Sequence, residues 1–231
     1  MERTDLFSLR EKEIFETLKK IKSFKFVIIG GYAVNAYTLP RFSVDCDIVV
    51  KDKDELDNVE QELLRLIYKK AYVDKNNASY YGDFEKYEKD LGNGFKVSID
   101  ILIKAVLDRY TNSTFSAEWV FNNSEIRELK GKTINEKLKI RIINPEALIV
   151  MKISSCRIND IRDVFMLAPY IKDKEWIKQE ISKRYEFNER FSKLKEKILS
   201  QQFKDGLQGV FGFVDNKVFE KHKKMILELE K

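Results

Sequence analysis

The chain has 231 residues, of which 43% are hydrophobic and only three are proline, a composition typical of an ordered globular protein. A formal net charge of +5, from 43 basic and 38 acidic residues, favours a polyanionic partner only mildly. One histidine and two cysteines cannot form a four-ligand zinc site, so any metal chemistry must use oxygen ligands, which favours Mg²⁺ or Mn²⁺.

The N-terminal elements begin with a helix. The capping pattern Ser8-x-x-Glu11 predicts its start, and its apolar stripe continues to about residue 22. Residues 26–29 are all apolar and predict a buried strand. The glycine pair Gly30-Gly31 then separates this strand from a helix over residues 32–38, which a following proline ends.

The next strand, residues 44–50, alternates between an acidic and an apolar face. Asp45 and Asp47 share the acidic face with their Cα atoms roughly 7 Å apart, so their carboxylates can converge on one cation. Cys46 belongs to the apolar face, which favours a buried thiol over a disulfide with Cys156.

A second amphipathic helix and a hairpin follow. The helix is predicted over residues 52–70, with an apolar face that extends to Ile67. The turn signal Gly92-Asn93-Gly94 predicts a hairpin between strands at residues 80–90 and 95–104. The second of these strands carries Asp100 on the face opposite the core.

The pattern changes near Asn144 from mixed strands and helices to helices only. Asn144-Pro145 predicts the cap and first residue of a nearly all-apolar helix. We therefore predict an α+β fold: an N-terminal domain with a mixed β-sheet flanked by helices (residues 1–143) and a C-terminal all-helical domain (residues 144–231). The later elements are expected as a mixed loop and short helix at 107–123, strands at 125–134 and 139–143, and helices at 145–156, 160–170, 175–184, 189–202 and 214–229.

The N-terminus gives no sign of export or membrane insertion. Its first eight residues are charged and lack an apolar signal core, and no apolar run approaches the ~20 residues of a membrane span. We expect a cytoplasmic protein without a membrane partner.

The glycine turn and the aspartates together resemble a known family. Gly30-Gly31, a helix and the segment Arg41-Phe42-Ser43-Val44-Asp45-Cys46-Asp47 resemble the nucleotidyltransferases of the DNA polymerase β superfamily. The tyrosine after the glycines and the Arg-x-Ser before the aspartates are most similar to the AbiEii-type toxin branch, which includes enzymes that add nucleotides to transfer RNA. The resemblance implies a nucleoside triphosphate substrate and magnesium.

Three acids are the candidate catalytic and metal-binding residues: Asp45, Asp47 and Asp100. Two-metal phosphoryl transfer uses clustered carboxylates, and a third one can also help to remove the acceptor proton. In the family the third acid lies on a later strand with apolar neighbours, and Ile99-Asp100-Ile101 matches this pattern. The alternative is three solvated aspartates on strand faces.

Gly30 and Gly31 are the candidate phosphate cradle, because glycines allow the backbone to approach phosphates at a helix N-terminus. The alternative is a simple tight turn. Many relatives have a serine in this pair, so the chain lacks that hydroxyl, and Ser43 is a candidate to replace it.

Two cations are candidate triphosphate ligands. Arg41 can pair with phosphates through two parallel hydrogen bonds, or it can form a salt bridge with Asp45 or remain solvated. Lys152 resembles the lysine that follows Pro-Glu-x-Leu in the family and reaches the nucleotide phosphates. The alternatives for Lys152 are a surface position or a bridge to Asp163.

Other polar residues are expected to have supporting roles. Arg157, Asp160 and Asp163 match an Arg-x-x-Asp-x-x-Asp pattern of AbiEii-type proteins and are interpreted as a scaffold that positions Lys152. His222 is expected to face solvent. Core packing is expected for the aromatic residues near the site, although base stacking is an alternative use. These aromatic residues are Tyr32, Tyr37, Trp119 and Phe121.

The hypothesis is a metal-dependent nucleotidyltransferase that moves a nucleoside monophosphate from a triphosphate to an acceptor hydroxyl. The resemblance favours the 3′ end of transfer RNA as acceptor and a toxin with a cognate antitoxin protein as partner. Small molecules and protein hydroxyls are the alternative acceptors. The competing hypothesis is a non-catalytic protein on the same fold that binds a nucleotide or a partner.

Overall fold

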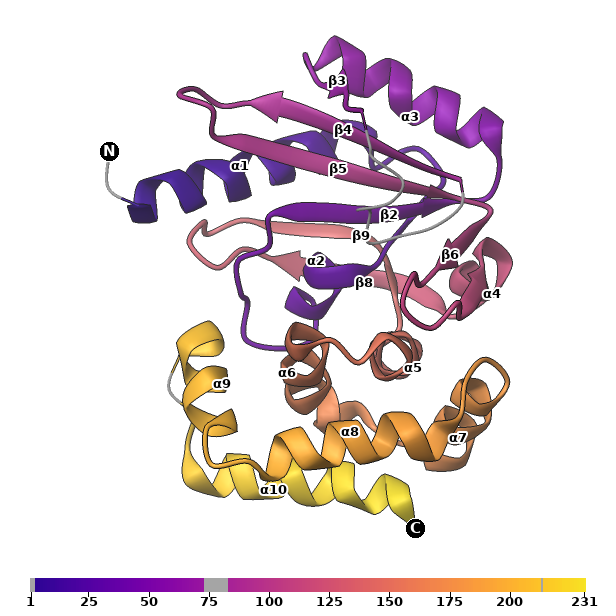
Figure 1. The fold of residues 1–231 in the computed structure, drawn as a ribbon. Helices are drawn as coiled ribbons and strands as arrows, with labels where there is room; N and C mark the ends of the chain where they lie inside the picture. Colours follow the sequence, from indigo (N-terminus) through magenta and orange to yellow (C-terminus); the bar gives the residue numbers. More distant parts are fainter. Residues whose placement is uncertain (1–2, 73–82, 213) are drawn as a thin grey trace.

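A seven-stranded mixed sheet organises the first part of the computed structural model, which describes residues 3–72, 83–212 and 214–231 (Figure 1). The strand order is β3-β4-β5-β2-β1-β9-β8. The pairs β2–β5 and β1–β9 are parallel, and the other neighbours are antiparallel. The strands are β1 (Val27–Ile28), β2 (Asp45–Val50), β3 (Lys69–Lys70), β4 (Phe84–Asp90), β5 (Lys96–Ile103), β8 (Ser124–Lys130) and β9 (Lys137–Ile143).

Helices and a small ribbon surround this sheet. Helix α1 (Arg3–Ile21) packs against β5, and α3 (Lys53–Arg65) packs against α1, β2 and β5. The short helix α2 (Gly30–Asn35) lies beside β2. A two-stranded ribbon of β6 (Ala105–Leu107) and β7 (Thr114–Ser116) leads into α4 (Ala117–Asn122).

Every described element after β9 is helical, and these helices lie together below the sheet in Figure 1. The predicted α+β class, a mixed sheet with flanking helices followed by a helical C-terminal part, is therefore confirmed. The division into domains at residue 144 stays a prediction. The α-helices are α5 (Pro145–Ser155), α6 (Ile158–Leu167), α7 (Lys174–Ser182), α8 (Phe187–Leu199), α9 (Phe203–Phe211) and α10 (Asn216–Leu227), with short 3-10 helices at Ala168–Tyr170 and Glu228–Glu230.

Local sequence signals explain several boundaries. The Asn144 side chain accepts a hydrogen bond from the Ala147 amide at 2.8 Å, so the predicted cap of α5 is confirmed. The predicted hairpin is also confirmed: β4 and β5 pair antiparallel, and residues 92–94 all have positive φ between them. Residues 80–82, at the start of the predicted first strand, lie outside the described part of the chain.

Other predicted boundaries were wrong. The helix predicted over residues 52–70 ends at Arg65, because Ile67 turns out of it with a φ of +68° and β3 follows. Ile67 is 69% exposed, so it does not belong to the apolar face. The sequence also did not predict α9, and β8 ends at Lys130 instead of residue 134.

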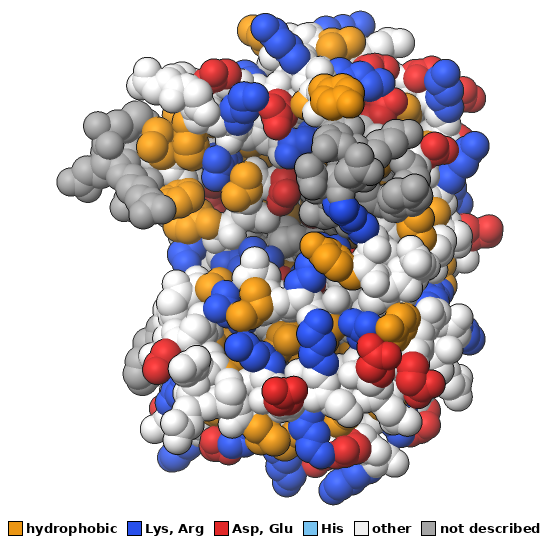
Figure 2. All heavy atoms as spheres, viewed as in Figure 1, with side chains coloured by type: hydrophobic (Ala, Val, Ile, Leu, Met, Phe, Trp, Pro, Cys, Tyr) orange, Lys and Arg blue, Asp and Glu red, His pale blue; other side chains and the backbone are white. Residues whose placement is uncertain are grey.

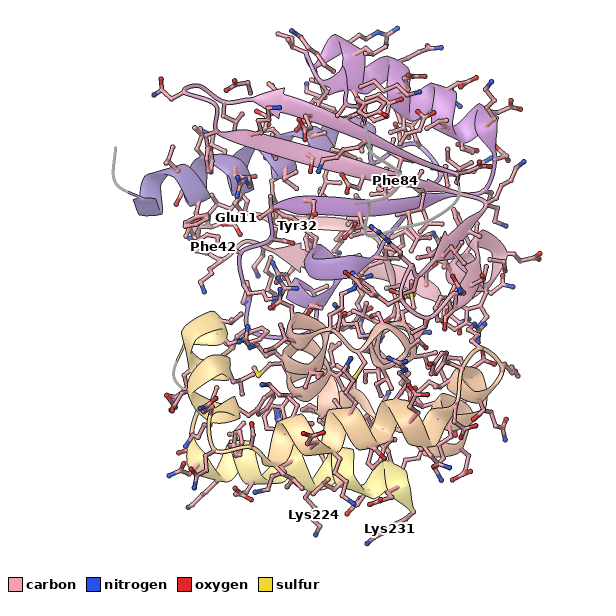
Figure 3. All side chains as sticks on the ribbon, viewed as in Figure 1. Glu11, Tyr32, Phe42, Phe84, Lys224 and Lys231 are labelled. Atoms are coloured by element: carbon pink, nitrogen blue, oxygen red, sulfur yellow. The ribbon has the colours of Figure 1, made fainter. Side chains whose placement is uncertain are left out.

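A buried carboxylate explains why β8 ends where it does. Glu11 of α1 is buried and accepts hydrogen bonds from the Lys132 amide at 2.6 Å and from the Thr133 amide and hydroxyl at 2.8 and 2.7 Å. The turn after β8 therefore closes around a side chain from the N-terminal helix. Phe42, labelled near Glu11 in Figure 3, also contacts this turn, since the Lys132 ammonium lies 5.1 Å from the Phe42 ring centre.

No helix in the described ranges combines the length and the apolar character that crossing a membrane would require.

Candidate active site

A pocket of about 400 Å³ lies where β2 and β5 meet the helical half. All eight residues predicted for the site line this one pocket, although they are spread from residue 30 to residue 152 of the sequence. Figure 2 shows the corresponding side of the molecule, with Lys and Arg side chains along the helical side of the hollow between the two halves. The eight residues are Gly30, Gly31, Arg41, Ser43, Asp45, Asp47, Asp100 and Lys152.

The acids come from two neighbouring parallel strands. Asp47 of β2 is the direct partner of Asp100 of β5, and Asp45 is the partner of Ser98. Because these strands alternate, the register places Asp45, Asp47 and Asp100 on the same face of the sheet. Asp47 and Asp100 are each only 6% exposed.

The Asp100 carboxyl group is buried in the pocket with a raised pKa. Burial raises its pKa to about 7, and the nearby charge of Asp45 adds to this effect, while Lys86 of β4 opposes it. The Asp100 Oδ1 atom is buried and has no hydrogen-bond partner among the described residues. Burying a carboxylate oxygen without a hydrogen-bond partner costs free energy, and a ligand bound to this atom would offset that cost.

These observations fit a divalent cation in part. Carboxylate oxygens are the ligands that Mg²⁺ and Mn²⁺ prefer, and an ion beside Asp100 would satisfy its buried oxygen. The described residues nevertheless contain no group of three or more acidic, histidine or cysteine side chains already arranged to hold a metal. The acids share a pocket without forming a finished metal centre.

The glycine turn touches both the acids and Ser43. Gly30 has a φ of +64° and begins α2, two residues earlier than predicted. A Cβ atom on Gly31 would lie 2.4 Å from the Ser43 hydroxyl oxygen and 3.2 Å from Arg41 Nη2. The Ser43 hydroxyl therefore occupies the space that a side chain at position 31 would fill.

Arg41 pairs with an acid of the helical half. Its Nε and Nη2 atoms donate to the two carboxylate oxygens of Asp163, both at 2.7 Å, and Nη1 donates to the Phe42 carbonyl at 3.1 Å. The alternative of a salt bridge with Asp45 was wrong. Asn35, which the sequence did not reveal, fixes the Arg41 backbone by accepting from its amide at 3.0 Å and donating to its carbonyl at 2.9 Å.

Lys152 is buried against two carboxylates. Its ammonium lies 2.7 Å from Asp163 Oδ2 and 3.0 Å from Asp160 Oδ1, so the predicted alternative of a bridge to Asp163 is observed. Burial acts to lower the pKa of Lys152, but Asp163 and Asp160 outweigh it and raise the pKa, which keeps the ammonium charged. Lys152 also lines the pocket.

The junction between α5 and α6 is held by its own polar contacts. Asp160 Oδ2 accepts from the Ser155 hydroxyl at 2.9 Å and from the Arg157 amide at 3.2 Å. The Arg157 side chain donates to Asp108 Oδ2 at 2.7 Å. Asp108, which the sequence did not single out, also accepts from the Thr111 amide and hydroxyl, so an Asp-x-x-Thr turn signal was present.

Two remaining predictions concern residues away from the pocket lining. His222 does not face solvent: it is 8% exposed, and its Nδ1 atom lies 3.0 Å from the Phe165 carbonyl. Tyr32 and Tyr37 are buried, and the Tyr37 hydroxyl donates to the Ile143 carbonyl at 2.9 Å. Trp119 and Phe121 are partly buried and pack against the same core, so core packing, the expected use of these aromatic residues, holds for all four.

A mixed sheet with paired aspartates on neighbouring strands, next to a glycine turn, defines the class of protein as a nucleotidyltransferase fold. The family model described as "nucleotidyl transferase of unknown function (DUF2204)" matches residues 10–201, and the chain belongs to this family. No curated protein matches the sequence significantly. These matches do not test the AbiEii-type branch, which stays a prediction.

Solved structures share the fold at low sequence identity. MenT4, a nucleotidyltransferase toxin from Mycobacterium tuberculosis, is similar with a TM-score of 0.57 and 14% identity, over 98% of this chain and 84% of that chain. A candidate nucleotidyltransferase from Helicobacter pylori is similar with a TM-score of 0.51 and 15% identity, over 99% of this chain and 96% of that chain. These similarities concern the fold alone.

Proposed function

We propose that the protein transfers a nucleoside monophosphate from a nucleoside triphosphate to an acceptor hydroxyl and releases pyrophosphate. The observation that carries this proposal is the pocket itself: residues far apart in sequence meet there, and they combine three acids of β2 and β5 with the cations Arg41 and Lys152. Phosphoryl transfer depends mainly on positioning and on charge stabilisation, and this arrangement supplies both.

Asp45, Asp47 and Asp100 would hold Mg²⁺, with Mn²⁺ as an alternative. When bound, the metal neutralises charge on the attacking and leaving oxygens. Asp100 would also help to remove the proton of the acceptor hydroxyl, because its carboxyl group lines the same pocket as the other two acids.

The other residues of the pocket would bind the triphosphate. Gly30 and Gly31 would let the backbone approach the phosphates, and the Ser43 hydroxyl above Gly31 would donate a hydrogen bond to them. Arg41 and Lys152 would supply the positive charge. Each cation keeps N–H groups beyond those bound to Asp160 and Asp163.

The 3′ end of transfer RNA is the favoured acceptor, because the sequence resembles the AbiEii-type branch. A toxin role with an antitoxin partner follows from the same resemblance and agrees with the fold similarity to MenT4, which is described as a toxin. Small molecules and protein hydroxyls are the other acceptor classes.

The test is incubation of the protein with labelled nucleoside triphosphates, magnesium, total RNA and total protein. We expect label in the RNA fraction and none with the Asp45→Asn, Asp47→Asn double variant. The control is Asp205→Asn, which changes an exposed acid at the start of α9. Equal labelling by the double variant would rule out the enzyme.

A non-catalytic nucleotide-binding protein is the second candidate. The absence of a finished three-acid metal group among the described residues favours it. Calorimetry separates the two candidates, since a binding protein should hold the nucleotide equally well with and without magnesium and should not turn it over.

A further inference from the structure

One carboxylate of the helical half binds both cations of the pocket. Asp163 lies on α6 with an exposed fraction of 0%, and it is not itself among the pocket-lining residues. Its Oδ1 atom accepts from Arg41 Nε, and its Oδ2 atom lies 2.7 Å from both Arg41 Nη2 and Lys152 Nζ. Asp163, which lies behind the pocket wall, therefore fixes Arg41 and Lys152 relative to each other.

The charges of this cluster balance. Arg41 and Lys152 contribute two positive charges, and Asp160 and Asp163 contribute two negative charges. Buried charges without partners are costly, so the two cations need both acids when no phosphate is present. The planar fork between Arg41 and Asp163 also fixes the direction of the guanidinium group, which a single hydrogen bond would not do.

The Arg41 segment is fixed at both its backbone and its side chain. Asn35 holds the backbone amide and carbonyl, and Asp163 holds the guanidinium group. Ser43 follows two residues later, so the position of its hydroxyl over Gly31 depends on the same anchoring.

We propose that Asp163 is a positioning residue for the triphosphate. It acts through Arg41 and Lys152 by fixing the two side chains relative to each other, so that both bind the phosphates together. This inference rests on the proposed function, because it assumes that these two cations bind phosphates. Asp160 differs in a useful way, since it contacts Lys152 but forms no hydrogen bond with Arg41 among the described contacts.

The experiment measures the affinity for inorganic tripolyphosphate by calorimetry, which needs no knowledge of the preferred base. We expect Asp163→Asn, an isosteric change, to weaken binding about tenfold or more. Asp160→Asn, the matched control, should weaken binding less because the Arg41 fork stays intact. In an Arg41→Met, Lys152→Met background, Asp163→Asn should cause no further loss, since the groups through which it acts are gone.

A general structural role predicts a different pattern. Asp163→Asn would then lower the melting temperature but would leave the affinity for tripolyphosphate unchanged, or it would weaken binding equally in the wild-type and doubly substituted backgrounds. Either result would overturn the proposal.

Arg41→Lys provides a second variant should Asp163→Asn not fold. It keeps the positive charge but cannot form the fork with Asp163. We expect a near-normal melting temperature with weakened tripolyphosphate binding, and full affinity in this variant would contradict the positioning role.

The outcome also separates the inference from the proposed function. Binding that depends on Asp163 without any nucleotide transfer by the wild-type protein would support the positioning role and contradict the transferase. Transfer by the wild-type protein, together with unchanged binding in Asp163→Asn, would support the transferase and contradict the positioning role.

Discussion

Gly30 lies directly against the carboxylate of Asp47. A Cβ atom built on Gly30 would be 2.0 Å from Asp47 Oδ2 and 2.9 Å from its carboxyl carbon. The neighbouring backbone is also held against Asp47, because the Ile29 amide donates a hydrogen bond to the Asp47 carbonyl at 3.0 Å. The glycine turn and the candidate metal-binding strand therefore form one packed unit.

Replacing this glycine should disrupt the unit. Gly30→Ala forces a side chain into the Asp47 carboxylate and into a φ of +64°, so we expect a loss of about 2 to 4 kcal/mol of folding stability. Nucleotide transfer should be lost with it. The control is Gly209→Ala in α9, where no described atom lies within 4 Å of the added carbon and helix propensity predicts a gain of about 1 kcal/mol. Denaturant unfolding of both variants measures the difference, and equal stabilities would contradict the packed unit.

The Ser43 hydroxyl over Gly31 predicts that a serine can be exchanged between the two positions. Ser43→Gly should raise the KM for the triphosphate about tenfold through loss of one hydrogen bond to a charged group. Gly31→Ser alone should be worse, because its Cβ atom would lie 2.4 Å from Ser43 Oγ. The double variant should return to within a few-fold of the wild type in steady-state kinetics. A double variant as impaired as the worse single variant would show that the two positions do not share this role.

The Asp100 carboxyl group predicts a pH-dependent stability. Its pKa is raised from an ordinary 3.8 to about 7, chiefly by burial, so between these values the folded protein holds a proton that the unfolded chain releases. Stability contributed by this group is complete below pH 4 and is lost as the pH rises towards 7 and beyond. In unfolding measured from pH 4 to pH 8, Asp100→Asn should therefore remove a negative contribution to the slope, so the stability of this variant relative to the wild type should rise with pH.

Stabilisation by Mg²⁺ through Asp100 should instead increase as the pH rises. Only the ionised carboxylate binds a cation, so added Mg²⁺ should stabilise the wild-type protein more at pH 8 than at pH 5. Stabilisation by Mg²⁺ of equal size in Asp100→Asn would show that Asp100 is not a ligand.

His222 predicts sensitivity to acid. Burial lowers its pKa below 6.5, and its Nδ1–H group donates to the Phe165 carbonyl. Because the folded protein takes up this proton less readily than the unfolded chain, the stability from His222 is present above pH 6.5 and is lost as the pH falls through its lowered pKa. His222→Gln should remove this step from the unfolding profile and cost about 1 kcal/mol at neutral pH through the changed hydrogen bond. As His222 is the only histidine in the chain, the assignment is direct.

The elements that carry the acids could be predicted because their signals are local. Alternation placed Asp45 and Asp47 on one face of β2, and a glycine turn marked the hairpin that carries Asp100. The bridge between Lys152 and Asp163 was among the alternatives, but the partner of Arg41 could not be predicted in the same way. Asp163 lies 122 residues from Arg41, and only the packing of α6 against the sheet half brings them together.

The wrong boundaries have local physical reasons. A positive φ is uncommon for a β-branched residue, so nothing in the sequence marks Ile67 as the end of a helix. Helix α9 contains Gly206 and Gly209, and each glycine lowers the helix propensity of its segment by about 1 kcal/mol. Its stability therefore comes from its buried apolar side chains, Phe203, Leu207 and Phe211.

The contact of Glu11 with the turn after β8 has a consequence for synthesis of the chain. A nascent polypeptide that ends before Lys132 offers Glu11 none of its donors, which are the Lys132, Thr133 and Ile134 amides and the Thr133 hydroxyl. Strand β1 similarly has no neighbour on one side until β9 is made, since Ile28 pairs with Ile142. Roughly the first three-fifths of the protein must therefore leave the ribosome before α1 and β1 have all of these partners. We therefore expect long-range closure, and not local helix formation, to limit folding.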